Sequence, residues 1–181
     1  IAVLGCGRPA SPYMTKLAGP QAAGHLLSGV GGRAEKPVCY ELPMGTTART
    51  IVEQHAGGLK KGTKMRAFIP GGASTGFLPP DKLDVAMDPE SLRKEGTMLG
   101  TGGITVLPEE VSIVDSERVF SRFFRHETCG QCTNCREGSA WSDQVIARFQ
   151  RGEGRLEDFV LLDEIMRGSK GRTICVFPEA F

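Results

Sequence analysis

The sequence predicts an α+β fold in which a small domain of short strands is followed by a bundle of helices. Short β-branched or aromatic runs between Gly and Pro residues occupy residues 25–107, and amphipathic helical patterns occupy residues 108–181. Residues 1–24 are rich in Gly, Ala and Pro and have little periodicity. We expect them to be the tail of a preceding domain and a connection.

The first domain is expected to contain four strands, one helix and one long excursion. The helix spans about 48–56; a hydroxyl of Thr46 or Thr47 can cap it, and Gly57–Gly58 ends it. From Val38 onward, the order strand, helix, strand, long excursion, strand is typical of a β-grasp-like domain. The expected strands are His25–Val30, Val38–Leu42, Met65–Ile69 and Ile104–Leu107.

The second domain is expected to contain three helices and the start of a fourth. Asp115–Ser116 can cap the first helix, and the next two span about 136–151 and 155–167. Pro178 beside an acidic residue is typical of a helix start, which predicts a four-helix bundle whose last member is missing. The apolar stripes expected to form its core are Val119, Phe120, Phe123 and Phe124; Trp141, Val145, Ile146 and Phe149; and Leu156, Phe159, Val160, Leu162, Ile165 and Met166.

The two ends of the chain predict an internal piece of a longer polypeptide. The sequence begins with Ile1 rather than Met, and it stops at Phe181 directly after the signal for a new helix. Ile1–Leu4 is expected to be a short strand of the preceding domain.

The overall composition is that of an ordinary globular protein. The chain has 181 residues, of which 40% are hydrophobic and 24% charged, with a net charge of +1. This charge gives no reason to expect nucleic acid as a partner. No apolar run approaches the roughly 18 residues that cross a bilayer, so we expect no direct membrane insertion.

Four cysteines form the clearest chemical pattern of the sequence. Cys129, Cys132 and Cys135 follow one another at two-residue separations in a loop between two helices, and Cys175 comes much later. A [4Fe–4S] cluster needs one thiolate for each iron, and three ligands from a loop with one from a distant segment is a recurrent solution. Arg136 adds positive charge at the edge of this loop.

Spacing alone leaves two alternatives open for these cysteines. A structural zinc site also uses Cys-x-x-Cys pairs, although it usually takes one pair from each of two segments. Two disulfides are disfavoured because three cysteines within seven residues leave one without a local partner. The remaining Cys6 and Cys39 are isolated and are expected to be small buried hydrophobic residues. The pattern therefore favours a reducing compartment in which thiolates persist.

Other candidate residues carry weaker signals. His25 and His55 stand alone and are expected to be structural. His126 is expected to lie beside the metal ligands, where it hydrogen-bonds to them or tunes the potential of the site without binding the metal itself. The Gly-rich segments 70–76 and 100–103 lack the nucleotide-binding patterns of a P-loop or a dinucleotide fold. We interpret both as turn-rich connectors.

The cysteine motif and several upstream segments resemble the NADH-binding flavoprotein subunit of respiratory complex I. Related diaphorase subunits occur in NAD-linked hydrogenases and formate dehydrogenases. The similarity covers roughly residues 28–178 in family order, and the segments that carry it are Tyr40–Thr47, Ile69–Thr75, Met87–Asp88, Met98–Gly102, His126–Gly138 and Gly171–Cys175.

This resemblance implies a soluble-ligand-binding β-grasp domain followed by a helical iron–sulfur domain. In that family NADH reduces FMN, and the flavin passes single electrons through a [4Fe–4S] cluster to further clusters and finally to quinone. The cluster ligands carry over one for one to Cys129, Cys132, Cys135 and Cys175. The resemblance also implies other iron–sulfur subunits as partners, and a bacterial cytoplasmic location on the inner face of the membrane.

The chain departs from the family pattern in three respects. Thr128 stands where the family usually has Ser, Asn134 where it usually has Pro, and residues 16–34 form a longer approach to the first domain than usual. The flavin loop and the acidic NADH segment would precede Ile1, so we expect no binding of FMN or oxidation of NADH by this piece alone. Two other functions stay open: the same relay in a hydrogenase or formate dehydrogenase, and a zinc-stapled, non-enzymatic interaction module.

Overall fold

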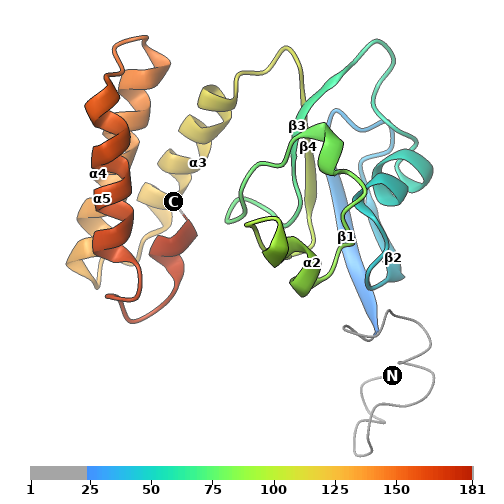
Figure 1. Cartoon of the computed structure of the whole chain (residues 1–181), viewed down its shortest axis with the longest axis horizontal. Coiled ribbons are helices and arrows are strands. Elements are labelled where there is room, and N and C mark those ends of the chain that lie inside the picture. Colours follow the sequence, from blue (N-terminus) through green and yellow to red (C-terminus); the bar gives the residue numbers. More distant parts are fainter. Residues whose placement is uncertain (1–23, 181) are drawn as a thin grey trace, which may run out of the picture. The chain divides into compact units, whose positions relative to one another are not determined.

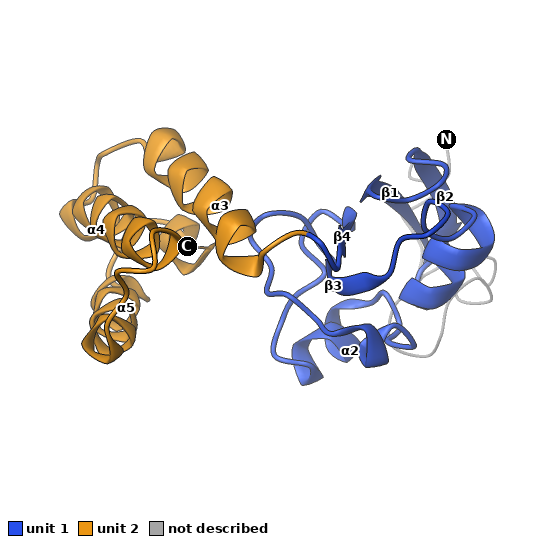
Figure 2. Cartoon of the chain, turned by 90° about the horizontal axis from the view of Figure 1, so that it is seen from above, with its two compact units in different colours: residues 1–110 blue, residues 111–181 orange. Residues whose placement is uncertain are grey.

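The computed structural model describes residues 24–180, and the chain divides into two compact units (Figures 1 and 2). The first unit extends to Glu110 and the second begins at Val111. The first contains one four-stranded sheet and the second consists of helices, so the predicted mixture of α and β structure is confirmed. The expected strand Ile1–Leu4, and Cys6, lie outside the described residues.

The sheet of the first unit has the strand order β2-β1-β4-β3. The central strands β1 and β4 run parallel, and each pairs with an antiparallel strand on its outer side. All four strands lie where the sequence predicts them, with ends that differ by two residues at most. Their bounds are β1 His25–Gly32, β2 Cys39–Pro43, β3 Met65–Ile69 and β4 Ile104–Pro108.

Three short helical segments accompany the sheet. The predicted helix is observed as the π-helical segment η2 (Thr50–His55), and the Thr47 hydroxyl accepts the N–H of Thr50 at 3.2 Å as predicted. The sequence interpretation missed α2 (Pro89–Lys94), whose first turn is capped by the Asp88 carboxylate. A 3-10 turn, η3 (Pro80–Lys82), precedes it. An acid followed by Pro is a helix-start signal that could have revealed α2.

The core of the first unit lies between the sheet and these helical segments. Ile51, Phe68 and Met87 are fully buried there and come from η2, β3 and the segment before α2. The strand β1 alternates buried and exposed residues, as expected for a strand with one face on the core. Ser28, also buried, donates its hydroxyl to the Gly102 carbonyl at 2.9 Å and so joins β1 to the approach to β4.

The two Gly-rich segments contact each other, which explains their glycines. Gly71 accepts the N–H of Thr101 at 2.9 Å, and Gly72 donates to the Gly103 carbonyl at 2.9 Å. A Cβ atom at Gly71 would lie 2.3 Å from the Leu99 carbonyl oxygen, and one at Gly100 would lie 2.2 Å from the Gly71 carbonyl oxygen. The segments therefore form a tight backbone junction.

The second unit contains the helices α3 (Ile113–Glu127), α4 (Thr133–Gln150) and α5 (Leu156–Ser169) and the 3-10 turn η4 (Phe177–Ala180). The cap of α3 is Ser112, so the helix begins earlier than the predicted cap at Asp115–Ser116. The helix α4 also begins earlier than predicted, and Cys135 is therefore within its first turn. No helix in the part of the chain that the structure describes is long and apolar enough to cross a membrane.

Two buried carboxylates connect the helices of the second unit. Asp143 on α4 is 3% exposed and pairs with Arg118 and Arg125 of α3; Arg125 lies at 2.9 Å. Asp158 at the start of α5 pairs with Arg148 of α4 and with Arg155 at 3.1 Å.

Hydrogen bonds from these two arginines hold the pKa of Asp158 well below its usual range. Because the folded-state pKa is lowered, this carboxylate stabilises the fold at neutral pH and loses that effect as the pH falls through the folded pKa.

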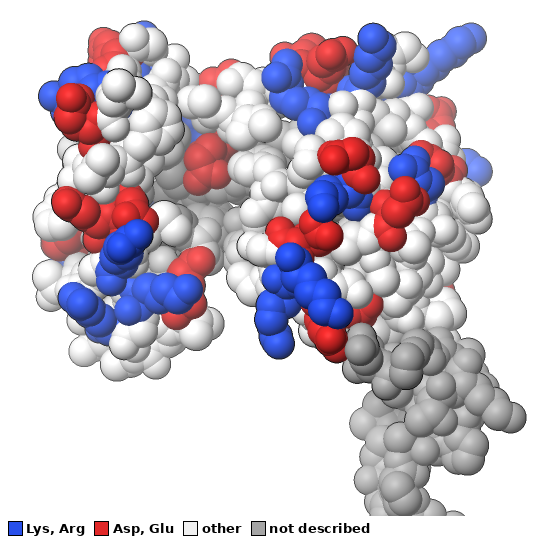
Figure 3. Space-filling model, in the orientation of Figure 1, with Lys and Arg blue, Asp and Glu red and all other residues white. Residues whose placement is uncertain are grey.

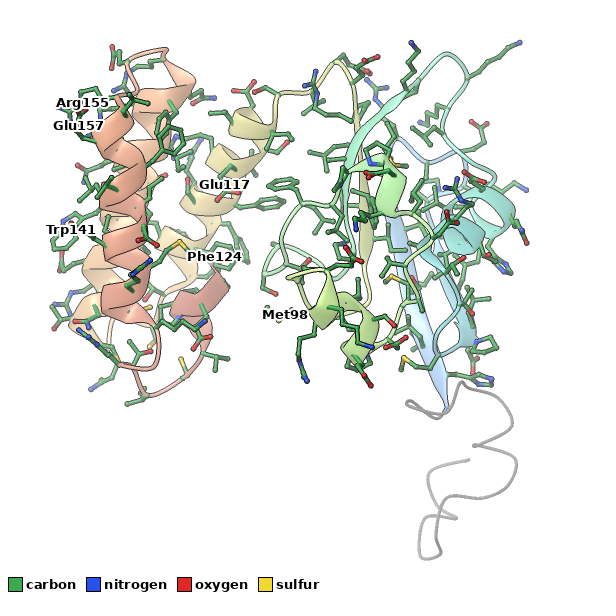
Figure 4. The ribbon with its side chains drawn as sticks, in the orientation of Figure 1. Met98, Glu117, Phe124, Trp141, Arg155 and Glu157 are labelled. Carbon is green, nitrogen blue, oxygen red and sulfur yellow. The ribbon has the colours of Figure 1, made fainter. Side chains whose placement is uncertain are left out.

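The apolar stripes of these helices are only partly core, which corrects the sequence interpretation. Phe124, Val145 and Ile165 are buried, but Val119, Trp141 and Phe159 are between 53% and 64% exposed. Figure 4 shows Trp141 pointing outward from α4. Helical periodicity identifies only the residues that share one face of a helix. In the second unit, no described element of that unit packs on the outer faces of α4 and α5.

The junction of the Gly-rich segments leads to a prediction for Gly71. Gly71→Ala is expected to lower the free energy of unfolding by about 2 kcal/mol, because the new methyl group overlaps a backbone carbonyl that cannot move freely. Urea denaturation followed by circular dichroism measures the loss. Gly76→Ala is the control: its Cβ would lie 3.9 Å from the nearest atom, and a change below about 0.5 kcal/mol is expected. Equal stability of the two variants would contradict the prediction.

The buried carboxylate of Asp143 leads to a second prediction. Asp143→Asn is expected to cost about 3 kcal/mol, because two arginines lose the charge that balances them. Trp141 is the only tryptophan, so its fluorescence during urea denaturation reports the unfolding of this unit. The control is Asp163→Asn, which removes the exposed pair with Arg167 at 2.7 Å and should cost less than about 0.5 kcal/mol. A similar cost for both variants would show that burial of Asp143 is unimportant.

Candidate metal centre

The structure places three of the four predicted ligands around the start of α4. Cys129 lies in the short loop after α3, Cys132 is the residue that caps α4, and Cys135 lies in the first turn of the helix. Cys175 lies in the segment between α5 and η4. Cys135 is buried, Cys132 is half-buried, and Cys129 and Cys175 are exposed.

The segment that carries Cys175 contacts the cysteine loop directly. The backbone N–H of Ile174 donates to the Cys132 sulfur at 3.5 Å. Two residues after Cys175, the ring of Phe177 packs edge-on against Phe124 of α3, with ring centres 5.6 Å apart. Phe124 lies between α3 and this segment in Figure 4. The fold thus brings the distant fourth cysteine to the same end of the helical unit as the other three.

A second pair of contacts joins the start of α4 to the end of α5. Asn134 donates its side-chain amide to the Gly168 carbonyl at 2.7 Å, and the Ser169 hydroxyl donates to the Asn134 carbonyl at 3.2 Å. The chain therefore leaves α5 beside the cysteine loop. The sequence interpretation treated Asn134 only as a departure from a family pattern, because no local signal marks a contact 34 residues away.

The loop between Cys129 and Cys132 is held by polar contacts. Gly130 has a φ of +75°, which favours glycine at this turn. Arg136 donates to the Gly130 carbonyl at 2.8 Å, so the residue predicted to contribute charge also fixes the loop. The Thr128 hydroxyl lies 3.2 Å from the Cys135 sulfur.

The start of α4 favours negative charge. The first N–H groups of a helix have no partner within the helix, and the helix dipole places partial positive charge at this end. The first turn of α4 contains no acidic residue, and Arg136 follows Cys135 directly. Thiolates and an anionic cluster would therefore be stabilised here. Elsewhere, acidic and basic side chains are interspersed on the face of each unit that Figure 3 shows.

Two kinds of site bind four thiolates, and they differ in the distance between the sulfurs. In a four-thiolate zinc site the sulfurs are about 3.8 Å apart, because each lies about 2.3 Å from one ion. Each thiolate of a [4Fe–4S] cluster binds a different iron, so its sulfurs stand farther apart. Within residues 24–180 no three His, Cys, Asp or Glu side chains converge closely enough to hold one metal ion. The two cysteine segments that meet here carry four thiols, the number that either kind of site requires.

The weaker candidates of the sequence lie apart from the cysteine sulfurs. His25 is 3.0 Å from Glu41, and the His55 ring contacts Tyr40, both within the first unit. His126 is 86% exposed and contacts Glu127 at 3.0 Å; the described part of the chain shows no contact between it and a cysteine. Cys39 is exposed, contrary to prediction, because it lies on the outward face of the edge strand β2.

Comparison with known proteins agrees with the predicted resemblance. Residues 115–181 match the family model described as the NADH-ubiquinone oxidoreductase-F iron-sulfur binding region. The F 2 subunit of NADH-quinone oxidoreductase from Rhizobium meliloti is 42% identical over 88% of this chain and 38% of its own length. The corresponding F subunit from Escherichia coli is 42% identical over 84% of this chain and 35% of its own length.

A solved structure shows the same fold. An NAD+-reducing [NiFe]-hydrogenase chain superposes with a TM-score of 0.80 and 25% identity, over 91% of this chain and 28% of the hydrogenase chain. This chain spans well under half the length of these relatives. The resemblance predicted from the cysteine motif is therefore confirmed: residues 115–181 match the iron–sulfur binding region of the NADH-ubiquinone oxidoreductase F family, and the chain is related over most of its length to the F subunits of NADH-quinone oxidoreductases.

Proposed function

We propose that this chain is the electron-relay part of an NADH-oxidising flavoprotein subunit, with one [4Fe–4S] cluster held by Cys129, Cys132, Cys135 and Cys175. The observation that carries the proposal is the meeting of two distant cysteine segments, where the Ile174 N–H donates to the Cys132 sulfur. The match of residues 115–181 to an iron–sulfur binding region supports it. When bound, such a cluster accepts and donates single electrons.

The residues of the chain would serve this relay in distinct ways. The four cysteines supply deprotonated sulfur ligands, and the free N–H groups at the start of α4 offset their negative charge. The burial of Cys135 keeps water from one side of the site, while the exposure of Cys129 and Cys175 leaves another side close to the surface. Electron exchange with a neighbouring protein needs such a short route to the surface.

The activity of the full-length subunit is part of the same proposal. Relatives named as F subunits of NADH-quinone oxidoreductase support an NADH dehydrogenase in which electrons pass from NADH through FMN to this cluster. The residues that bind NADH and FMN would belong to the remainder of the subunit. Electrons would continue through further iron–sulfur subunits to quinone, and the subunit would lie on the cytoplasmic face of the bacterial membrane.

The domain arrangement follows from this proposal. Residues 1–24 would connect to the flavin-binding domain, residues 25–107 would form a β-grasp-like domain, and residues 108–181 would form a helical bundle that binds the cluster. A mixed sheet with central parallel strands, in contact with the helical segment η2, supports the β-grasp-like assignment. Three packed helices with the cysteines at one end support the bundle.

A second candidate is the same relay in an NAD-linked hydrogenase or formate dehydrogenase. The superposition on an NAD+-reducing [NiFe]-hydrogenase chain favours this alternative. Sequence identity is higher to the quinone-linked relatives, at 42% against 25%, so we favour the quinone-linked context. The genes that flank the coding sequence would distinguish the two contexts, because hydrogenase and complex I subunits are encoded by different neighbours.

Reconstitution tests the cluster directly. The 181-residue chain, treated with iron and sulfide under argon, is expected to bind four irons and to give an EPR signal of a reduced [4Fe–4S] cluster. Cys175→Ser is expected to lose or degrade that signal, because one iron lacks its thiolate. Cys39→Ser, in the other unit, is the matched control and should bind iron like the wild type. A chain that takes up one zinc ion and forms no cluster would instead support the zinc-stapled interaction module.

A further inference from the structure

We infer that Thr128 is a positioning residue whose hydroxyl hydrogen-bonds to the Cys135 thiolate and raises the reduction potential of the bound cluster. This inference rests on the proposed cluster. Its structural basis is the distance of 3.2 Å between Thr128 Oγ1 and Cys135 Sγ, within hydrogen-bonding range for sulfur. Cys135 is the most buried of the four ligands, with 6% of its surface exposed, so water competes little for this sulfur.

The backbone around Thr128 fixes the position of its side chain. Thr128 ends α3, and its own N–H donates to the Phe124 carbonyl at 3.1 Å. Phe124 is itself buried and packs against Phe177. A β-branched residue also has few side-chain rotamers, so its hydroxyl loses little freedom when it contacts the sulfur.

The hydrogen-bond partners of Thr128 determine the direction of donation. The N–H of Gly130 donates to Thr128 Oγ1 at 3.3 Å, which occupies one acceptor position of the oxygen. A cysteine that binds a metal has lost its proton, so the sulfur can only accept. In the contact with Cys135, the Thr128 hydroxyl is therefore the donor when the cluster is bound. Two hydrogen bonds then follow one another, from the Gly130 N–H to the Thr128 oxygen and from the Thr128 hydroxyl to the Cys135 sulfur. Each of them polarises the other.

A hydrogen bond to a ligand sulfur has a defined effect on electron transfer. Reduction adds one electron, and hence one negative charge, to the cluster and its thiolates. A donor at the sulfur stabilises the more negative form, so it raises the potential. Among the described residues two donors reach a ligand sulfur, the Ile174 N–H at Cys132 and the Thr128 hydroxyl at Cys135. The second can be removed by a side-chain substitution that leaves the backbone unchanged.

Redox titration of the reconstituted chain, monitored by EPR with dithionite as reductant, tests this inference. Thr128→Val keeps the branched shape but removes the hydroxyl, and its midpoint potential is expected to fall by about 59 mV, which corresponds to a tenfold shift of a one-electron equilibrium. Thr128→Ser keeps the hydroxyl and is the matched control, with a potential close to that of the wild type. Thr128→Ala serves as a second variant without a hydroxyl.

The outcomes separate this inference from the proposed function. Failure of the wild-type chain to form a cluster would overturn the proposed function itself. Clusters in all variants with equal potentials would leave the proposed function intact and overturn the role of Thr128. Loss of the cluster in both Thr128→Val and Thr128→Ala would also overturn it, since the hydroxyl would then hold the loop rather than act on the sulfur. A lower potential in these two variants, restored in Thr128→Ser, supports the inference.

Discussion

The hydrogen bonds between the start of α4 and the end of α5 are the constraint on which the site depends. Three cysteines follow one another in the sequence, but Cys175 is separated from them by the whole of α4 and α5. Asn134 and Ser169 join the two helices at one end, with hydrogen bonds of 2.7 and 3.2 Å. The chain that leaves α5 must therefore pass beside Cys132, where Ile174 contacts the sulfur. Together with the packing of Phe177 against Phe124, this junction fixes the position of the segment that carries Cys175.

Buried charges give the helical unit its geometry because its apolar core is small. In the described residues the buried apolar side chains of this unit are Phe124, Cys135, Val145, Ile165 and Pro178. Asp143 and Asp158 are as buried as these; the first receives two arginines from α3, and the second receives one from α4 and one from its own helix cap. Ion pairs are directional, whereas apolar contacts are not. The two carboxylates therefore fix how the helices align, and with them the end at which the cysteines meet.

The sequence predicted the strands, the three long helices and the cysteines, but neither α2 nor the contacts between the elements. Strands could be located because β-branched or aromatic runs such as Met65–Ile69 are bounded by turn residues, and Cys129, Cys132 and Cys135 have a spacing with few interpretations. Asn134 and Asp143 gave no signal, because an isolated polar residue does not indicate its distant partner. The exposed Trp141 was wrongly expected in the core for a related reason: periodicity defines a face, and only tertiary structure covers it.

Both residues that depart from the expected family pattern at the cysteine loop make contacts of their own in this chain. Thr128, where the sequence resemblance leads us to expect Ser, places its hydroxyl 3.2 Å from the Cys135 sulfur. Asn134 in place of the usual Pro gives up a residue whose fixed φ suits the first turn of a helix. Its amide instead bonds to Gly168, a contact that a proline side chain cannot make. In this chain the first turn of α4 is therefore held from outside the helix, by a direct bond to α5.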